Sequence, residues 1–345
     1  MKKVIIPIIA AIVVLSISGC AKHAPEEANK ANKDYFDAWM SLNYPELYEE
    51  GPVGLGIYVI EETEGTGIEV KEGGYALMDY VVSDLEGNVS AYTTEDMAKQ
   101  LGTYKESNYY GPKFQTTAKG ALPAGLAEAL KGMKVGGSKK VIIPTWLMSY
   151  SSHDTEEEYL EESSSTLSSI YKFTVRDFTE DAIEWQIGKI GEYFTENAGT
   201  FGGMTVADSL PDHKGFYYKQ LVAPTDTTSF KKDTTIYINY TGRLIDGTVF
   251  DTTNERLAKD SGIWSASRTY APVSIKWGEE YSDITMGSGG VITGFGLTLW
   301  QMREFEKGIG VFTSEYGYGY SGSGDNIPGF APLVFEIEIV AKPED

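Results

Sequence analysis

The chain has 345 residues, of which 41% are hydrophobic and 12% aromatic, and its 29 Lys and Arg face 50 Asp and Glu, a formal net charge of −21. This composition is too apolar for a disordered chain, and the length suits two globular domains. The acidic excess argues against nucleic acid as a partner, because phosphate binding depends on Lys and Arg. One cysteine and three histidines exclude an intrachain disulfide or a thiolate metal cluster and leave little material for a zinc or serine–histidine enzyme.

The first twenty residues predict export and a lipid anchor. The basic start Met1-Lys2-Lys3 precedes an apolar run, 4–17, that is too short for a transmembrane span. The next residues, Ile17-Ser18-Gly19-Cys20, resemble a bacterial lipobox, whose cysteine becomes the lipidated first residue; an ordinary signal peptide is the alternative. We therefore expect a signal peptide over 1–19 and a lipid anchor on Cys20 in the bacterial cell envelope. The outer membrane is preferred over the inner one because no Asp follows the cysteine.

The chain repeats itself. Matching residues recur at an offset that rises in order from 158 to 160 and then, after one insertion, to 169; examples are Tyr35/Tyr193, Tyr80/Tyr240, Gly87/Gly247, Glu95/Glu255, Pro112/Pro272, Gly125/Gly294 and Met133/Met302. Chance matches would scatter, so we predict two head-to-tail copies of a unit of about 160 residues. The predicted boundaries are 20–50 for a tether and helix, 51–180 for the first domain, 181–214 for a linker helix and 215–345 for the second domain.

Each unit opens with an amphipathic helix and continues in strands. In the second copy the helical spacing of Ile183, Ile187, Ile190 and Phe194 predicts that helix, which either binds a partner or packs on its own domain, the reading we favour. An alternating strand over 235–240 leads to Asp246-Gly247, a hairpin signal. A short helix over 295–302, a strand over 309–313 and an alternating strand over 333–339 complete the unit. The predicted fold class is α+β, with antiparallel sheets.

A set of motifs in the second copy carries a family resemblance. The segment 239–251 contains Tyr-Thr-Gly, then Asp-Gly, then Phe-Asp, and it closely resembles the FKBP-type peptidyl-prolyl isomerases. Downstream, 291–295, 316–319 and 333–335 resemble the start of that family's central helix, its Tyr-x-Tyr-Gly turn and its final strand. The resemblance covers 215–343 and implies two FKBP-like domains, each a bent antiparallel sheet wrapped around a short helix. It also implies an apolar pocket and isomerisation of Xaa-Pro bonds by a tandem-domain bacterial lipoprotein.

The resemblance also implies the site residues. The expected catalytic residues are Tyr240, Phe250, Asp251, Ile292, Tyr318 and Phe335, and the expected substrate-binding residues are Val273, Val291, Phe295 and Ile327. An Xaa-Pro amide rotates over a barrier of about 18–20 kcal/mol, and an apolar cup that strips water from the amide lowers the cost of losing its conjugation. Such catalysis needs no metal or cofactor. Val273 replaces a common Phe, and the stretch 252–271 is longer than in minimal members and could form a lid or contact surface.

The first copy has lost most of these residues. At the matching offsets it has Ser90 for Phe250, Ala91 for Asp251, Pro123 for Ile292, Leu126 for Phe295 and Ser149 for Tyr318. Pro123 also lacks the backbone N–H that Ile292 would offer to a substrate. We therefore predict that the first domain folds like the second without isomerising proline, and that it serves as a spacer, chaperone surface or docking module.

Two other groups of residues look like sites but have simpler explanations. His153, Asp154 and 156–158 suggest metal ligands, but a solvated acidic face explains them better. The glycines of 287–290 suggest a phosphate loop, but no strand–loop–helix context surrounds them, and a turn before the central helix is the better explanation.

The expected substrates are proline-containing unfolded or exported polypeptides, met at a membrane through the lipid anchor. Two other functions remain open. The protein could be a non-catalytic chaperone or an accessory subunit of an outer-membrane assembly or transport complex. It could also be a glycan-binding surface lipoprotein that uses some of its 23 tyrosines and six tryptophans.

Overall fold

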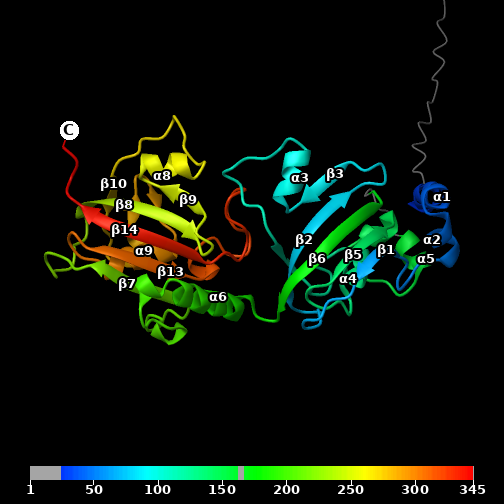
Figure 1. Cartoon of the computed structure of the whole chain (residues 1–345), viewed down its shortest axis with the longest axis horizontal. Coiled ribbons are helices and arrows are strands. Elements are labelled where there is room, and N and C mark those ends of the chain that lie inside the picture. Colours follow the sequence, from blue (N-terminus) through cyan, green and yellow to red (C-terminus); the bar gives the residue numbers. More distant parts are fainter. Residues whose placement is uncertain (1–24, 162–166, 345) are drawn as a thin grey trace, which may run out of the picture.

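The computed structural model describes residues 25–161 and 167–344, so the predicted signal peptide and Cys20 lie outside the described residues. Two bodies lie side by side along the long axis of the molecule (Figure 1). We call the body built on strands β1 to β6 the first domain and the one built on β7 to β14 the second domain. No helix in the described part of the chain is long and apolar enough to cross a membrane.

The first domain is an antiparallel sheet with the strand order β1-β5-β6-β2-β3, in which β4 also pairs with β2. Its strands are β1 (Tyr58–Thr63), β2 (Tyr75–Ser83), β3 (Val89–Tyr92), β4 (Lys113–Thr116), β5 (Ser138–Ile143) and β6 (Ser169–Thr179). Its helices are α1 (Pro25–Asn43), α2 (Pro45–Glu50), α3 (Glu95–Gln100), α4 (Ala124–Leu130) and α5 (Glu156–Glu161), with a 3-10 turn η1 (Thr145–Met148).

The second domain is an antiparallel sheet with the order β12-β11-β10-β8-β14-β13-β7, in which β9 also pairs with β8. Its strands are β7 (Phe216–Val222), β8 (Thr235–Leu244), β9 (Val249–Thr252), β10 (Val273–Lys276), β11 (Thr285–Met286), β12 (Gly289–Gly290), β13 (Lys307–Phe312) and β14 (Leu333–Val340). Its helices are α6 (Ala182–Glu196), α7 (Ala198–Phe201), α8 (Glu255–Asp260) and α9 (Thr293–Gln301), with 3-10 turns η2 (Val206–Asp208), η3 (Tyr281–Asp283) and η4 (Ser314–Tyr316).

The offsets found in the sequence also relate the elements of the two sheets. β2 and β8, β3 and β9, α3 and α8, and β4 and β10 each begin 160 residues apart, whereas α4 and α9, and β5 and β13, begin 169 apart. The change falls between β10 and α9, where the second domain carries the β11–β12 hairpin. Within the described residues, β4 of the first domain has β2 as its strand partner, whereas β10 pairs with both β8 and β11.

The core of the second domain lies between the sheet and α9. Alternate residues of β8 are buried because successive side chains point to opposite faces, so Ile238 and Tyr240 face α9. α9 is apolar on nearly all sides, as expected for a helix enclosed by its own domain. Its Gly294 allows close approach: a Cβ there would lie 2.4 Å from the ring of Phe312. This close approach fixes where α9 begins relative to β13.

The amphipathic helix α6 packs on the other face of the second sheet. Its Ile190 and Phe194 are buried in a cluster with Tyr217 and Val334, and each such side chain contributes about 1.5–3 kcal/mol by leaving water. Asp181 caps the helix, since its carboxylate accepts bonds from two backbone N–H groups of the first turn at 2.9 and 3.0 Å. The apolar face of α6 is thus used inside its own domain, the reading that the sequence favoured.

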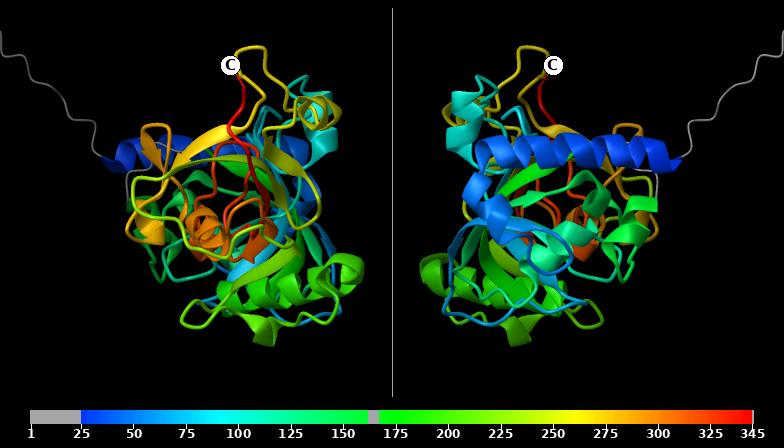
Figure 2. Two further views of the ribbon diagram at one scale, coloured as in Figure 1. Left: turned by 90° about the vertical axis from the view of Figure 1, so that its left-hand side faces the viewer. Right: turned by 90° about the vertical axis from the view of Figure 1, so that its right-hand side faces the viewer.

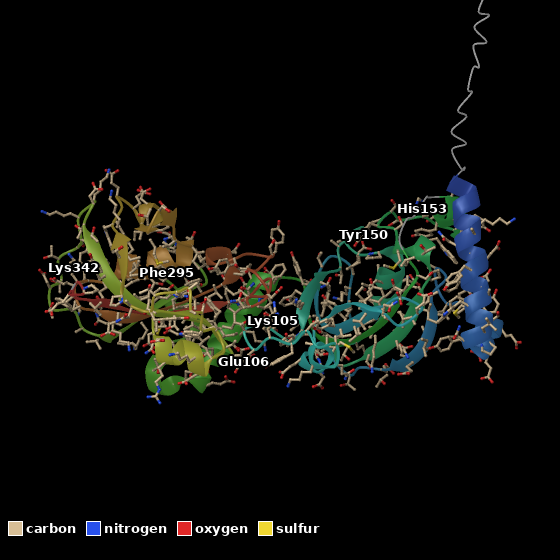
Figure 3. All side chains as sticks on the ribbon, turned by 90° about the horizontal axis from the view of Figure 1, so that it is seen from above. Lys105, Glu106, Tyr150, His153, Phe295 and Lys342 are labelled. Atoms are coloured by element: carbon tan, nitrogen blue, oxygen red, sulfur yellow. The ribbon has the colours of Figure 1, made fainter. Side chains whose placement is uncertain are left out.

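The first helix, α1, lies across the end of the first domain that is far from the second (Figure 2). Its Phe36 and Met40 are buried, and the ring of Phe36 meets Trp146 edge-on at 5.4 Å. Lys33 on the same helix bridges to Glu156 at 3.1 Å. The acidic segment near His153 is therefore partly a docking surface for α1. Seen from above, the side chains of Tyr150 and His153 lie in the first domain and Phe295 in the second (Figure 3).

Candidate active site

Four predicted aromatic residues meet in one cup in the second domain. Tyr240 comes from β8, Phe250 from β9, Phe295 from the first turn of α9, and Phe335 from β14; all are at most 8% exposed. Phe335 is central, with the rings of Phe295 and Phe250 edge-on to it at 5.1 and 5.5 Å. Edge-on pairs are a favoured aromatic geometry, so these contacts stabilise the arrangement of the rings.

The strand register explains why these rings converge. Gly242 of β8 pairs with Phe335 on one side and with Asp251 on the other. A Cβ at Gly242 would lie 2.6 Å from the ring of Phe250 and 2.9 Å from that of Phe335. The glycine of the Tyr-Thr-Gly motif therefore leaves the space in which the two rings close over the strand.

The remaining predicted apolar residues lie around the same core. Ile327 is buried in it, and the partly buried residues that pack against it include Val273, Val291, Ile292 and Tyr318. Ile292 is the residue just before α9, and Val273 lies opposite Ile238 on the neighbouring strand. The structure thus brings the predicted apolar residues together around one side of the second sheet.

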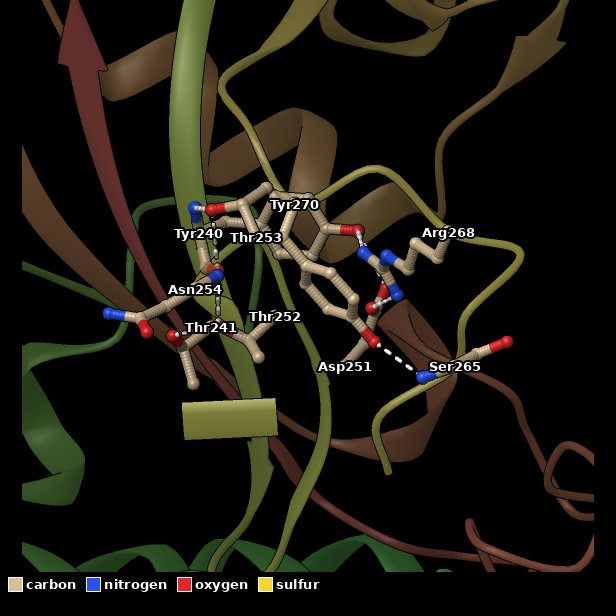
Figure 4. Close-up of polar contacts among 9 residues, drawn as sticks. All are labelled: Tyr240, Thr241, Asp251, Thr252, Thr253, Asn254, Ser265, Arg268 and Tyr270. Carbon is tan, nitrogen blue, oxygen red and sulfur yellow. Dashed lines mark hydrogen bonds and ion pairs between the residues drawn. The ribbon is translucent and has the colours of Figure 1, made fainter. Parts of the chain in front are cut away.

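A polar network lies beside the aromatic cup (Figure 4). The Tyr240 hydroxyl donates a hydrogen bond of 2.6 Å to the Asp251 carboxylate, and Asp251 also forms an ion pair with Arg268. The Arg268 guanidinium donates to the Tyr240 oxygen at 3.1 Å. Burial, together with the neighbouring carboxylate, raises the pKa of Tyr240. The tyrosine is therefore held neutral and acts as a hydrogen-bond donor towards Asp251.

Arg268 is a site residue that the sequence reasoning missed. It lies in the long stretch 252–271, which holds α8 and then returns towards β10. Its guanidinium lies over the ring of Tyr270 at 5.4 Å, and the Tyr270 hydroxyl accepts a bond from the Ser265 N–H at 2.9 Å. The long stretch 252–271 thus places the positively charged Arg268 next to the carboxylate of Asp251. The repeat held a signal for it, because the first copy has Asn108 at the matching position and Ala91 for Asp251, so both partners are missing together.

The first domain has the same strand register and helix position around the corresponding site, but not the same side chains. Ala91 lies opposite Val82 in the same register in which Asp251 lies opposite Gly242. By the same pairing, Tyr171 occupies the position of Phe335. Pro123 precedes α4 as Ile292 precedes α9. The described residues contain no group of three or more His, Cys, Asp or Glu placed to hold a metal ion.

These features define a class of domain: an antiparallel sheet folded over one short helix, with an aromatic cup at the start of that helix. The family model described as FKBP-type peptidyl-prolyl cis-trans isomerase matches residues 226–340. FK506-binding protein 1A of Aspergillus fumigatus is 32% identical over 123 residues, which are 35% of this chain and 90% of that protein. The chain therefore belongs to the FKBP-type peptidyl-prolyl cis-trans isomerase family, and the prediction from its motifs is confirmed.

Further relatives extend this picture. Human peptidyl-prolyl cis-trans isomerase FKBP2 is 34% identical over 110 residues, which are 32% of this chain and 62% of that protein. The crystal structure of the three FKBP domains of wheat FKBP73 covers 84% of this chain and 95% of that one, at 17% identity and a TM-score of 0.29. That score is too low to inform the arrangement of the domains. These relatives are eukaryotic, so the bacterial lipoprotein stays a prediction.

Proposed function

We propose that the second domain catalyses cis–trans isomerisation of Xaa-Pro bonds in polypeptides and that the first domain does not. The observation that carries this proposal is the aromatic cup around Phe335 with the Tyr240–Asp251–Arg268 network beside it. The first domain has neither the Phe250 nor the Asp251 equivalent, and the family model matches residues 226–340, which lie in the second domain.

The mechanism rests on binding the twisted amide better than either planar isomer. The proline ring packs against the aromatic surface formed by Phe250, Phe295 and Phe335, which excludes water from the amide. Loss of water weakens the charge-separated resonance that keeps the amide planar, and so lowers a barrier of about 18–20 kcal/mol. No bond to the enzyme forms or breaks.

Polar groups at the rim hold the substrate backbone. The Tyr318 hydroxyl and the Ile292 N–H bind substrate carbonyls, and Asp251 stabilises the twisted amide. Tyr240 and Arg268 keep the Asp251 carboxylate in place, so their role is positioning. Val273, Val291 and Ile327 complete the apolar wall that faces the residues around proline.

The repeat offers a matched test of this proposal. Tyr240→Phe removes the hydrogen bond to Asp251, and Tyr80→Phe makes the same change in the first domain. On the full chain, with a proline peptide as substrate, Tyr240→Phe should lower kcat/KM about tenfold, the size expected when a hydrogen bond to a charged group is lost. Tyr80→Phe should leave it unchanged. An inactive wild type would defeat the enzyme proposal, and an equal loss with Tyr80→Phe would contradict the assignment of activity to the Tyr240–Asp251 contact of the second domain.

We also propose that the protein acts on exported polypeptides from a lipid anchor at Cys20. The support is the sequence 17–20 and the position of the single cysteine. Cells that express the full chain should incorporate labelled fatty acid into it and retain it in the membrane fraction, whereas Cys20→Ser should abolish both. Unlabelled wild-type protein would contradict the anchor and leave the isomerase proposal intact.

A further inference from the structure

The loop between η4 and β14 contains a phenylalanine with an unusual backbone conformation. We call residues 318–332 the pocket loop; it begins at Tyr318, contains Ile327 and ends where β14 starts. Internal backbone bonds fold it tightly: Ser323 N–H donates to the Ile327 carbonyl at 2.9 Å, and Phe330 N–H donates to the Gly319 carbonyl at 2.9 Å. The loop therefore places two predicted substrate-contacting residues through one compact turn.

Phe330 in this loop has a φ of +61°, in the left-handed region. Glycine adopts this conformation freely, and the loop uses it at Gly319, Gly322 and Gly324. A bulky side chain there is strained, and such strain persists only where the surroundings hold the residue firmly. The surroundings of the Phe330 ring therefore bear directly on how the loop is held.

That contact comes from the first domain. The Phe330 ring meets Tyr75 of β2 edge-on at 5.1 Å and Phe114 of β4 edge-on at 5.5 Å. Phe114 is in turn held by Trp185 of α6, edge-on at 4.9 Å. The ring that holds the pocket loop in its strained form is thus packed among aromatic side chains of the neighbouring domain and the helix that joins the two.

A second contact joins the domains through the backbone. The Tyr109 N–H of the first domain donates a hydrogen bond of 2.8 Å to the Asp325 carbonyl of the pocket loop. The Tyr109 side chain also packs against the core of the second domain. In Figure 1 the orange-red loop before β14 lies on the side of the second domain that faces the first.

The first domain also contacts the stretch 252–271 of the second domain, which carries Arg268. A Cβ at Gly262, in the stretch that carries Arg268, would lie 2.3 Å from the side chain of Glu106. Lys105 and Glu106 lie midway along the molecule, where the two bodies meet (Figure 3). One segment of the first domain, 104–111, therefore touches both the pocket loop and the stretch 252–271.

We propose that the first domain is a positioning element for the catalytic pocket: Tyr75, Phe114 and Tyr109 hold the pocket loop so that Tyr318 and Ile327 face the substrate. This inference rests on the proposed isomerase function of the second domain. It explains how a domain without the catalytic side chains contributes to the reaction, since its strands β2 and β4 supply an aromatic cage for Phe330.

The test is a double-mutant cycle on the full chain. Phe114→Ala opens the cage, and kcat/KM for a proline peptide should fall about twofold to thirtyfold, the range of measured couplings between distant elements. Phe330→Gly removes both the ring and the strain, and should lower kcat/KM in the same range. Phe114→Ala added to Phe330→Gly should cost nothing further, because the cage then has no ring to hold. Additive losses would overturn the proposal.

Hydrogen exchange provides a readout that does not depend on activity. Amide exchange in 318–332 should rise in Phe114→Ala, and that in β13 should not change. Tyr150→Ala is the control, because Tyr150 lies in the first domain and is 60% exposed. Unchanged exchange and kcat/KM in a folded Phe114→Ala variant would refute the proposal. If Phe114→Ala does not fold, the test uses Phe330→Gly alone. Amide exchange and kcat/KM equal to those of the wild type in Phe330→Gly would then refute the proposal.

The two proposals fail in different ways. An inactive wild-type chain whose pocket loop still exchanges faster in Phe114→Ala would remove the isomerase function and, with it, the catalytic role of the cage, while the docking itself would stand. If the wild type is active and amide exchange in 318–332 does not change in Phe114→Ala, the positioning role is refuted and the isomerase function remains intact.

Discussion

The Asp251 carboxylate is held by two neighbours, the neutral Tyr240 and the charged Arg268. Tyr240 is buried and neutral, whereas Arg268 and Asp251 are about one third exposed, at 36% and 33% of their side chains. An ion pair as exposed as this contributes little to folding, about 1 kcal/mol or less, because water and salt screen it. The value of Arg268 is therefore in holding one carboxylate rotamer beside the cup.

Arg268→Ala should consequently affect the reaction more than the stability. We expect kcat/KM for a proline peptide to fall about tenfold, since the carboxylate loses a charged partner, with a change in unfolding free energy of about 1 kcal/mol or less. Arg256→Ala is the matched control, because Arg256 pairs with Asp260 on α8 and is 92% exposed; it should change neither quantity. Equal losses in the two variants would show that charge alone, without contact to Asp251, is responsible.

Most elements could be predicted from the sequence because their pattern is local. β8 and β14 alternate between buried and exposed positions, and α6 buries one face, so period and turn residues were sufficient. The β11–β12 hairpin was missed as a pair of strands and interpreted as a turn before the central helix. Each of its strands has two residues, too few for any periodic signal.

The conformation of the pocket loop could not be predicted from a local sequence pattern. Motif matching placed Tyr318 and Ile327 in the site, but nothing in the local sequence marks Phe330 as a residue with positive φ. Its conformation depends on Tyr75 and Phe114, more than 200 residues away in the chain. Contacts at that separation are decided by how the two domains dock.

At the scale of the whole molecule, the junction between the domains also contains a partly buried ionisable group, the phenol of Tyr109. Burial raises the pKa of Tyr109 to about 12, and Asp246 of the second domain and Asp79 of the first add to the effect. An unfolded tyrosine has a pKa of about 10. The folded junction thus binds this proton more tightly than the unfolded chain does.

This difference predicts an alkaline instability. The contribution of Tyr109 is fully present below about pH 10 and is lost as the pH rises from 10 to 12, because the unfolded state releases the proton first. Urea unfolding at pH 8 and pH 11 should show a larger loss for wild type than for Tyr109→Phe. Tyr150→Phe should follow wild type. Identical pH dependence in all three proteins would contradict the raised pKa of Tyr109 in the folded protein.

The sequence by itself determined the repeat, the fold class, the family and the residues of the aromatic cup, because these follow from periodicity and from motifs whose spacing survives in a linear chain. Only the tertiary structure revealed Arg268 on Asp251 and the aromatic cage around Phe330. Both depend on side chains that are brought together by loops and by domain docking, where no periodic pattern records the contact. The single cysteine and the charge of −21 are also properties of the sequence alone: they exclude an intrachain disulfide and argue against nucleic acid as a partner. Which side chains form the site depends on the tertiary structure.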